Sequence, residues 1–257
     1  MNKTALVLVA VVCAAGARAQ ESAWPATARS FPQAYSRRPL TLPPGMVEFE
    51  AFFTAAHYAE SCAPGCGSAY DSKSLFFAAW YGLIDRVDVG LSTGFGLNAD
   101  TRLVNGWNKT VVAGLTALAV HDGGFDLRAS LTAPVIWRQG SYAIQTGLFA
   151  RQLLGKLVFL EGDLQAAWLV APSAELGAGF NAILGFQLAP AVAARILYTA
   201  ASLSTGGSLN VNLLGSRASA QIICSPASAV DLFGTVGADV QRARDDYGFN
   251  AGLIVRL

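Results

Sequence analysis

The sequence has little charge and, beyond its N-terminal segment, no long uninterrupted hydrophobic run. Charged residues make up 14% of the 257 residues against 53% hydrophobic residues, and the formal net charge is +1. A balance this close to zero excludes the basic surface with which proteins hold nucleic acid. A transmembrane helix needs about 20 consecutive apolar residues, and no later stretch offers them. If so apolar a chain crosses a membrane without helices, it must close into a β-barrel.

The N-terminus is predicted to be a secretory signal peptide, residues 1–19. Lys3 precedes a short apolar run, and residues 17–19, Ala-Arg-Ala, form a small-residue cleavage site. Lipidation at Cys13 is the alternative, but Val12 is bulkier than the small residue that such processing requires. We therefore expect an exported protein.

The mature chain is predicted to have two parts. Residues 20–45 contain five prolines and are expected to form an irregular periplasmic lead-in. Residues 46–257 alternate between apolar residues and residues that are small or polar, with a period of two, as in strands with lipid on one side and a lumen on the other. About twelve such segments follow one another: 46–58, 72–84, 87–97, 108–120, 125–137, 141–154, 157–170, 175–188, 191–201, 208–224, 229–240 and 247–257.

The fold class predicted from this pattern is all-β, a transmembrane antiparallel barrel of about 12 strands with both termini in the periplasm. The links after every second segment are short, among them 85–86, 155–156 and Ser225-Pro226, as periplasmic turns should be. The alternative is an exported β-sandwich, whose strands also alternate. The second face is rich in glycine here, which favours the barrel.

Cysteine and histidine are scarce. Cys62 and Cys66 lie in the first outer loop, where Pro64-Gly65 supplies a turn, so a disulfide is expected in an oxidising compartment. Free thiols or a zinc site remain alternatives. A zinc site needs two more ligands with only His57 nearby, so we expect no metal and no cofactor. Cys224 is left without a partner.

A lipid-modifying hydrolase is a second function to consider. Some outer-membrane enzymes attack lipid esters with a histidine and a serine on the outer rim. His57 lies at the right depth, and Ser72 and Ser74 follow across the first loop. No serine motif accompanies them, so the sequence predicts no catalytic residue and no enzyme.

The predicted lumen face carries charges of both signs toward the periplasmic end. These charges either pair with one another to fill a narrow lumen or form a constriction that selects solutes, and the two roles are compatible. Because the first and last strands meet when a barrel closes, Arg256 should contact Glu48 or Glu50. The candidate lumen-lining residues are Glu48, Glu50, Asp88, Asp126, Arg128, Arg151, Glu161, Asp163, Arg195, Asp231 and Arg256.

Two stretches carry a family resemblance: residues 38–49 (RPLTLPPGMVEF) and residues 81–91 (YGLIDRVDVGL). With the alternating pattern of the mature chain, they resemble the outer-membrane barrels grouped as MetA-pathway phenol-degradation, or transporter-like, proteins. The resemblance implies a barrel that passes small, often hydrophobic compounds, and it supplies no catalytic residue. The final strand also resembles the C-terminal signal of outer-membrane barrels, although Leu257 stands where Phe is usual.

Together these observations predict a passive channel or uptake protein for small, hydrophobic or aromatic solutes in the outer membrane of a Gram-negative bacterium. The expected partners are outer-membrane lipid, a small-molecule solute and the barrel-assembly machinery, which would bind the C-terminal strand. No nucleic acid is expected. The alternatives are the lipid-modifying hydrolase and a structural or surface-interaction barrel with a packed lumen.

Overall fold

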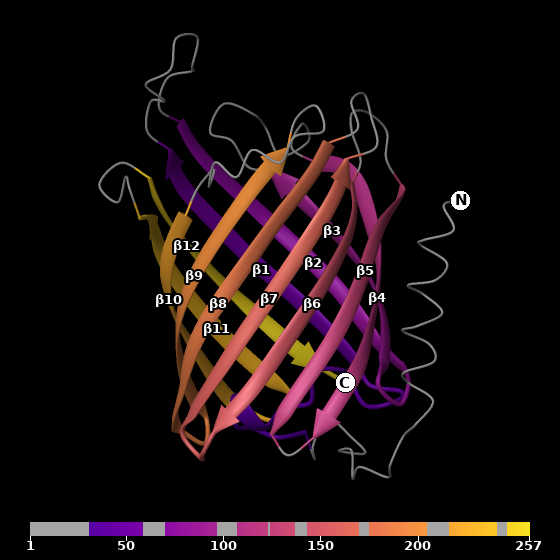
Figure 1. Ribbon diagram of the computed structural model, residues 1–257, viewed down its shortest axis with the longest axis vertical. Helices are drawn as coiled ribbons and strands as arrows, with labels where there is room; N and C mark the ends of the chain where they lie inside the picture. Colours follow the sequence, from indigo (N-terminus) through magenta and orange to yellow (C-terminus); the bar gives the residue numbers. More distant parts are fainter. Residues whose placement is uncertain are drawn as a thin grey trace.

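A computed structural model describes residues 31–58, 70–96, 107–122, 124–136, 143–169, 175–204, 216–240 and 246–257. These residues form one closed antiparallel sheet of twelve strands, with β1 paired to β12, and a short 3-10 turn, η1 (Tyr35–Arg37) (Figure 1). The strands are β1 (Val47–Tyr58), β2 (Tyr70–Ile84), β3 (Val87–Gly96), β4 (Trp107–Asp122), β5 (Phe125–Ile136), β6 (Ala143–Leu154), β7 (Val158–Leu169), β8 (Glu175–Ala189), β9 (Val192–Ser204), β10 (Ser216–Ala227), β11 (Val230–Asp239) and β12 (Tyr247–Arg256). Among the described residues, no helix is long and apolar enough to cross a membrane.

The alternating pattern becomes the two faces of the barrel wall. In β8, Leu176 and Leu184 are exposed on the outside, whereas Ile183 and Gly185 are buried on the inside. Large apolar side chains such as Leu91 and Leu164 continue this outer surface around the wall. An apolar exterior on a closed sheet is the property of barrels that lie in lipid. The predicted twelve-stranded antiparallel barrel is confirmed.

Most predicted segments match the strands within a few residues, but β10 differs. It begins at Ser216 and continues to Ala227, so the expected tight link at Ser225-Pro226 is wrong. The pairing with β11 shifts register between Cys224 and Ala227, and this irregularity accommodates the proline. The Ser225 amide still donates to the Ala191 carbonyl at 2.7 Å. The turn follows at residues 228 and 229.

Five short connections gather at one end of the barrel, together with the start of β1 and the end of β12 (Figure 1). We call it the periplasmic end, following the orientation that the sequence predicts. Arg86, in the link between β2 and β3, has a φ of 69°, and Gly155, between β6 and β7, has a φ of 82°. Such left-handed residues reverse the chain within a tight turn.

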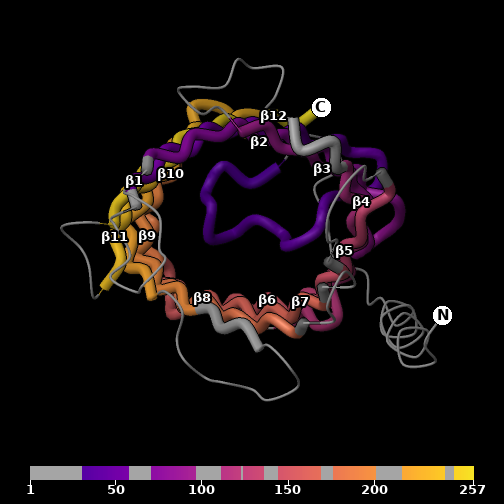
Figure 2. The backbone as a smooth tube through the Cα atoms, turned by 90° about the horizontal axis from the view of Figure 1, so that it is seen from above, coloured from indigo at the N-terminus to yellow at the C-terminus, as the bar shows by residue number. Residues whose placement is uncertain are grey.

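The N-terminal plug, residues 31–46, lies inside the barrel at the periplasmic end (Figure 2). The sequence predicts irregular backbone here, and outside η1 the backbone is irregular, but its place in the lumen was not anticipated. Gly82 of β2 allows the close approach, because a Cβ there would lie 2.0 Å from the Pro43 carbonyl oxygen. The Gly82 amide donates to the Met46 carbonyl at 2.9 Å.

Candidate functional site in the barrel lumen

Arg38 anchors the plug to the wall. Its guanidinium forms a two-pronged ion pair with Asp231 of β11, at 2.5 and 2.8 Å, and donates to the Ser225 hydroxyl at 2.7 Å. Further donations reach the plug's own Pro32 and Gln33 carbonyls. Arg38 is 5% exposed and Asp231 is 1% exposed. This charged contact is therefore almost fully removed from water, where losing either partner is costly.

Tyr35 of η1 inserts into a cluster of charges on the opposite wall. Its ring lies 4.8 Å from the guanidinium carbon of Arg151 and 5.1 Å from that of Arg195. Glu161 of β7 holds both arginines, at 2.7 Å and 2.8 Å. The Phe159 ring packs 5.6 Å from the Tyr35 ring. Cation–π contacts between desolvated groups favour this position for the plug.

Backbone groups of the plug complete its attachment. The Leu42 amide donates to Asp88 at 2.8 Å, and the Leu40 carbonyl accepts from Arg128 at 2.9 Å. The Arg38 carbonyl accepts from Arg151 at 2.8 Å. These wall side chains satisfy peptide groups that have no place in the sheet, which lets an irregular segment stay buried.

Arg256 closes the seam between the first and last strands. Glu48 and Arg256 lie opposite each other in the register, and their side chains form an ion pair at 2.7 Å. This pairing agrees with the sequence expectation for the seam. Arg256 also contacts Asp231 at 2.8 Å and lies over the Phe31 ring at 4.6 Å. The seam and the plug therefore share one charged cluster.

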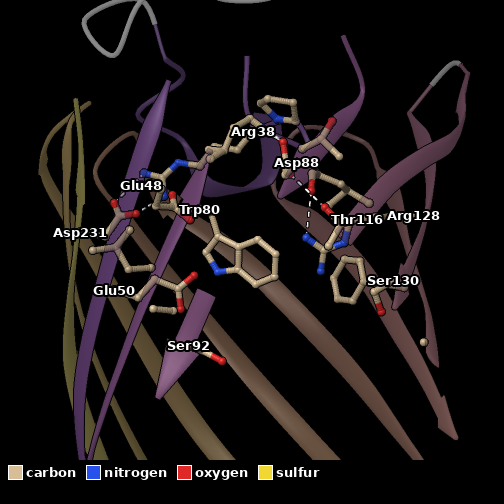
Figure 3. Close-up of a pocket in the computed structure, with 18 of the residues that line it drawn as sticks. Arg38, Glu48, Glu50, Trp80, Asp88, Ser92, Thr116, Arg128, Ser130 and Asp231 are labelled. Carbon is tan, nitrogen blue, oxygen red and sulfur yellow. Dashed lines mark hydrogen bonds and ion pairs between the residues drawn. The ribbon is translucent and has the colours of Figure 1, made fainter. Parts of the chain in front are cut away.

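A cavity of about 780 Å³ occupies the lumen between the plug and the wall. Figure 3 shows the Trp80 indole at its centre, with Glu50 and Arg128 on either side. Trp80 packs against the plug residues Phe31, Leu42 and Met46. Its ring fits over Gly90 and Gly114, where an added Cβ would approach within 2.5 Å. The other aromatic residues that the wall contributes to the lining are Phe52, Phe76, Phe149 and Phe233.

The eleven candidate lumen residues have different surroundings. Eight line the cavity: Glu48, Glu50, Asp88, Arg128, Arg151, Arg195, Asp231 and Arg256. Glu161 does not line the cavity, but it forms ion pairs with Arg151 and Arg195, which do. Asp163 accepts from the Asn181 amide at 3.1 Å, and Asp126 contacts His121 at 2.5 Å near the β4–β5 turn. The structure thus brings most of these residues together around the plug.

The histidine and serines of the hydrolase alternative do not meet. His57 contacts Asp71 at 2.8 Å and stacks on Tyr247 at 5.3 Å. Ser72 and Ser74 lie opposite Ala56 and Thr54, on the inward face of the wall. The His57 side chain projects from the opposite face, so it forms no pair with Ser72 or Ser74.

The remaining candidate sites are cysteines and metal ligands. Cys62 and Cys66, the expected disulfide, lie outside the described residues. Cys224 is a free thiol. In the part of the chain that the structure describes, no group of three or more His, Cys, Asp or Glu side chains could hold a metal ion.

Sequence reasoning missed the plug's own contributions to the site. Arg38 is a charged residue in a proline-rich segment, and Tyr35 is an aromatic residue three positions before it. Neither follows the alternating pattern from which lumen residues were selected. The positive charges of Arg37 and Arg38, against a surplus of predicted lumen carboxylates, were the one available signal.

No protein-family model and no curated protein sequence matches this chain. Among solved structures, the COG4313 outer-membrane channel from Pseudomonas putida F1 superposes with a TM-score of 0.64 at 11% identity, over 84% of this chain and 97% of that one. The NanC porin gives a TM-score of 0.60 at 7% identity, over 81% and 100% of the two chains. The KdgM porin gives 0.52 at 5% identity, over 80% and 98%.

The chain has the fold of an outer-membrane channel barrel. At these identities the likeness concerns the fold, and it agrees with the apolar outer wall and the polar lumen. The chain spans nearly the whole of each of these barrels. A shared fold does not identify the solute of a channel, so the solute has to be inferred from the residues of the lumen.

Proposed function

We propose that this barrel is a passive channel for small solutes in the outer membrane of a Gram-negative bacterium, with its N-terminal signal removed on export. The observation that carries this proposal is the cavity of about 780 Å³ inside a closed transmembrane wall. A lumen that served only as a structural core would be filled with side chains. This one holds space for solute beside a plug that narrows the periplasmic end.

In this proposal, most charged residues of the lumen serve to hold the plug in place. Arg38, Arg151 and Asp231 hold the plug or one another through buried contacts, so they are not free to bind a passing ion. Both charge signs are present close together, which cancels most of the field along the lumen. The channel should therefore show a small conductance and weak selectivity between anions and cations.

The solute class that fits is small and partly apolar. Five aromatic side chains of the wall, Phe52, Phe76, Trp80, Phe149 and Phe233, line the cavity beside Phe31 and Tyr35 of the plug. Phe52 and Phe76 stack at a centroid separation of 4.5 Å, which presents a flat apolar surface. A planar or aromatic solute can contact such a surface without unpairing the charges around it. This supports uptake of small aromatic compounds.

Two further partners belong to the same proposal. The exposed apolar side chains of the wall would contact membrane lipid. The exposed residues of the last strand, Tyr247, Phe249 and Leu253, would face the barrel-assembly machinery during insertion. Both follow from the position of these residues on the outer face.

The test is single-channel recording of the full mature chain in planar bilayers, combined with liposome swelling. The swelling panel should contain small aromatics, sugars and salts of matched size. We expect a small, weakly selective conductance and faster entry of the aromatic solutes. Absence of both conductance and flux would overturn the channel and favour the structural or surface-interaction barrel.

A further inference from the structure

Two charged residues stand apart from the charge network of the lumen. Arg38, Arg256 and Asp231 form one cluster, and Arg151, Arg195 and Glu161 form another. Glu48 pairs with Arg256, and Asp88 accepts from the plug and from Thr116. Within the described part of the lumen cavity, Glu50, Asp88 and Arg128 have no ion pair, but both carboxylate oxygens of Asp88 already accept hydrogen bonds. Glu50 and Arg128 are the two that retain unused hydrogen-bonding capacity.

Glu50 belongs to β1 and faces the cavity on the same side of the wall as Glu48 and Phe52. No hydrogen bond or ion pair joins its carboxylate to any residue that the structure describes. A carboxylate in a confined lumen is unfavourable unless water or a ligand satisfies it. Its oxygens are therefore available to a cation or a donor in the cavity.

Arg128 belongs to β5 and lies across the cavity from Glu50 (Figure 3). Its guanidinium donates to the Leu40 carbonyl, lies 5.3 Å from the Phe149 ring, and leaves Nε without a hydrogen-bond partner. A guanidinium has five N–H donors, and one backbone carbonyl uses a small part of that capacity. Arg128 is thus able to bind a carboxylate, the group that its planar fork fits best.

The space between these two charges is aromatic. The Trp80 indole lies between Glu50 and Arg128, and it is supported from behind by the plug residues Phe31, Leu42 and Met46 (Figure 3). Phe52 and Phe76 stand beside Glu50 in the lining, and Phe149 lies under Arg128. A flat ring lying over the indole would have one end near a carboxylate and the other near a guanidinium.

From this juxtaposition we propose that the cavity is a binding site for a small zwitterion with a flat apolar body. The ammonium group binds Glu50, the carboxylate binds Arg128, and the body lies against Trp80. This deepens the proposed channel function and rests on it, because the solute reaches the site along the lumen. A singly charged aromatic compound satisfies one end only and leaves the other charge unpaired, so the site discriminates against it.

Calorimetric binding to the full mature protein in detergent micelles tests the site without requiring flux. The probes are para-(aminomethyl)benzoate, a zwitterion at neutral pH, and its singly charged relatives benzoate and benzylamine. We expect the zwitterion to bind roughly tenfold more tightly than either relative, the typical effect of one further charge-assisted hydrogen bond. Equal affinity for all three compounds would overturn the proposal.

Glu50→Gln is the decisive variant, because the Glu50 side chain holds nothing else in the fold. It should reduce zwitterion affinity to that of benzoate and leave benzoate binding equal or tighter. Asp163→Asn is its matched control, since Asp163 lies on the lumen face but does not line the cavity. Unchanged zwitterion affinity in Glu50→Gln, or an equal loss in Asp163→Asn, would contradict the assignment.

Arg128→Gln should produce the reverse pattern, with the zwitterion bound no better than benzylamine. Arg217→Gln is the control, because Arg217 likewise donates to a single backbone carbonyl, that of Gly237. Conductance of the wild-type protein is recorded in parallel. Binding without conductance would refute the channel and keep the site, whereas conductance without preference for the zwitterion would refute the site and keep the channel.

Discussion

The two ends of the barrel treat charge differently. At the periplasmic end, Arg38 and Asp231 are 5% and 1% exposed, and they share their cluster with Arg256. Toward the outer end, His57 and Asp71 are 35% and 68% exposed, and they form a pair on the outer face. Removing one partner of a buried ion pair costs a large amount of stability, whereas an exposed pair contributes little stability. Whether a charged pair is buried in the lumen or exposed on the outer face therefore decides how much it contributes.

The largest effect is expected from Arg38→Ala. Removing one partner of a buried ion pair costs roughly 3–5 kcal/mol, and here that cost falls on the attachment of the plug. We expect single-channel conductance to rise severalfold while the barrel stays folded, because Asp231 retains Arg256. Arg217→Ala, which removes an arginine from the lumen without touching the plug, should leave conductance near the wild-type value. Unchanged conductance in Arg38→Ala would show that the plug does not limit flow.

Glu161→Gln tests the second periplasmic cluster. The amide preserves the shape but withdraws the charge that faces Arg151 and Arg195, so the free energy of unfolding should fall by about 2 kcal/mol. The midpoint of urea unfolding in detergent micelles measures this change. Asp163→Asn, on the same strand with amide partners only among its described contacts, should move the midpoint by less than half as much. An equal shift of the unfolding midpoint in both variants would mean that ion-paired and merely hydrogen-bonded lumen carboxylates contribute equally to stability.

Substitutions at two glycines, Gly82 beside the plug and Gly94 away from it, compare the plugged end with the rest of the lumen. In Gly82→Ala the new methyl group meets the Pro43 carbonyl at 2.0 Å, whereas in Gly94→Ala the nearest atom is 3.6 Å away. Overpacking of this kind costs roughly 1–3 kcal/mol, so Gly82→Ala should destabilise the protein and raise conductance. Gly94→Ala should be nearly neutral in unfolding and recording experiments. A larger loss of stability in Gly94→Ala than in Gly82→Ala would mean that the plug backbone at Pro43 can move aside at little cost.

The smallest effect is expected from His57→Ala. Its pair with Asp71 is exposed, so the unfolding free energy should change by less than about 1 kcal/mol. Conductance should not change, since the side chain lies outside the lumen. Lipid-ester hydrolysis by the wild-type protein that is lost in His57→Ala would instead revive the hydrolase alternative.

The barrel wall could be predicted from the sequence because lipid and lumen impose opposite demands on successive residues. The Glu48–Arg256 contact could also be predicted, since closure makes neighbours of the first and last strands. The position of the plug could not. Arg38 binds Asp231, 193 residues away, and no local pattern encodes such a partner. Trp80 likewise acquires its role only through the register that places Gly90 and Gly114 beneath it.

The shared position of Arg256 in the seam and in the plug cluster has a consequence for biogenesis. Arg256 ends β12, the strand that closes the sheet against β1. Its contact with Glu48 forms only when β12 meets β1, whereas its contact with Asp231 lies within the β11–β12 pair. Phe31 of the plug gains its contact with Arg256 only once β12 is in the sheet. Closure of the barrel and attachment of the plug are thus coupled through one side chain.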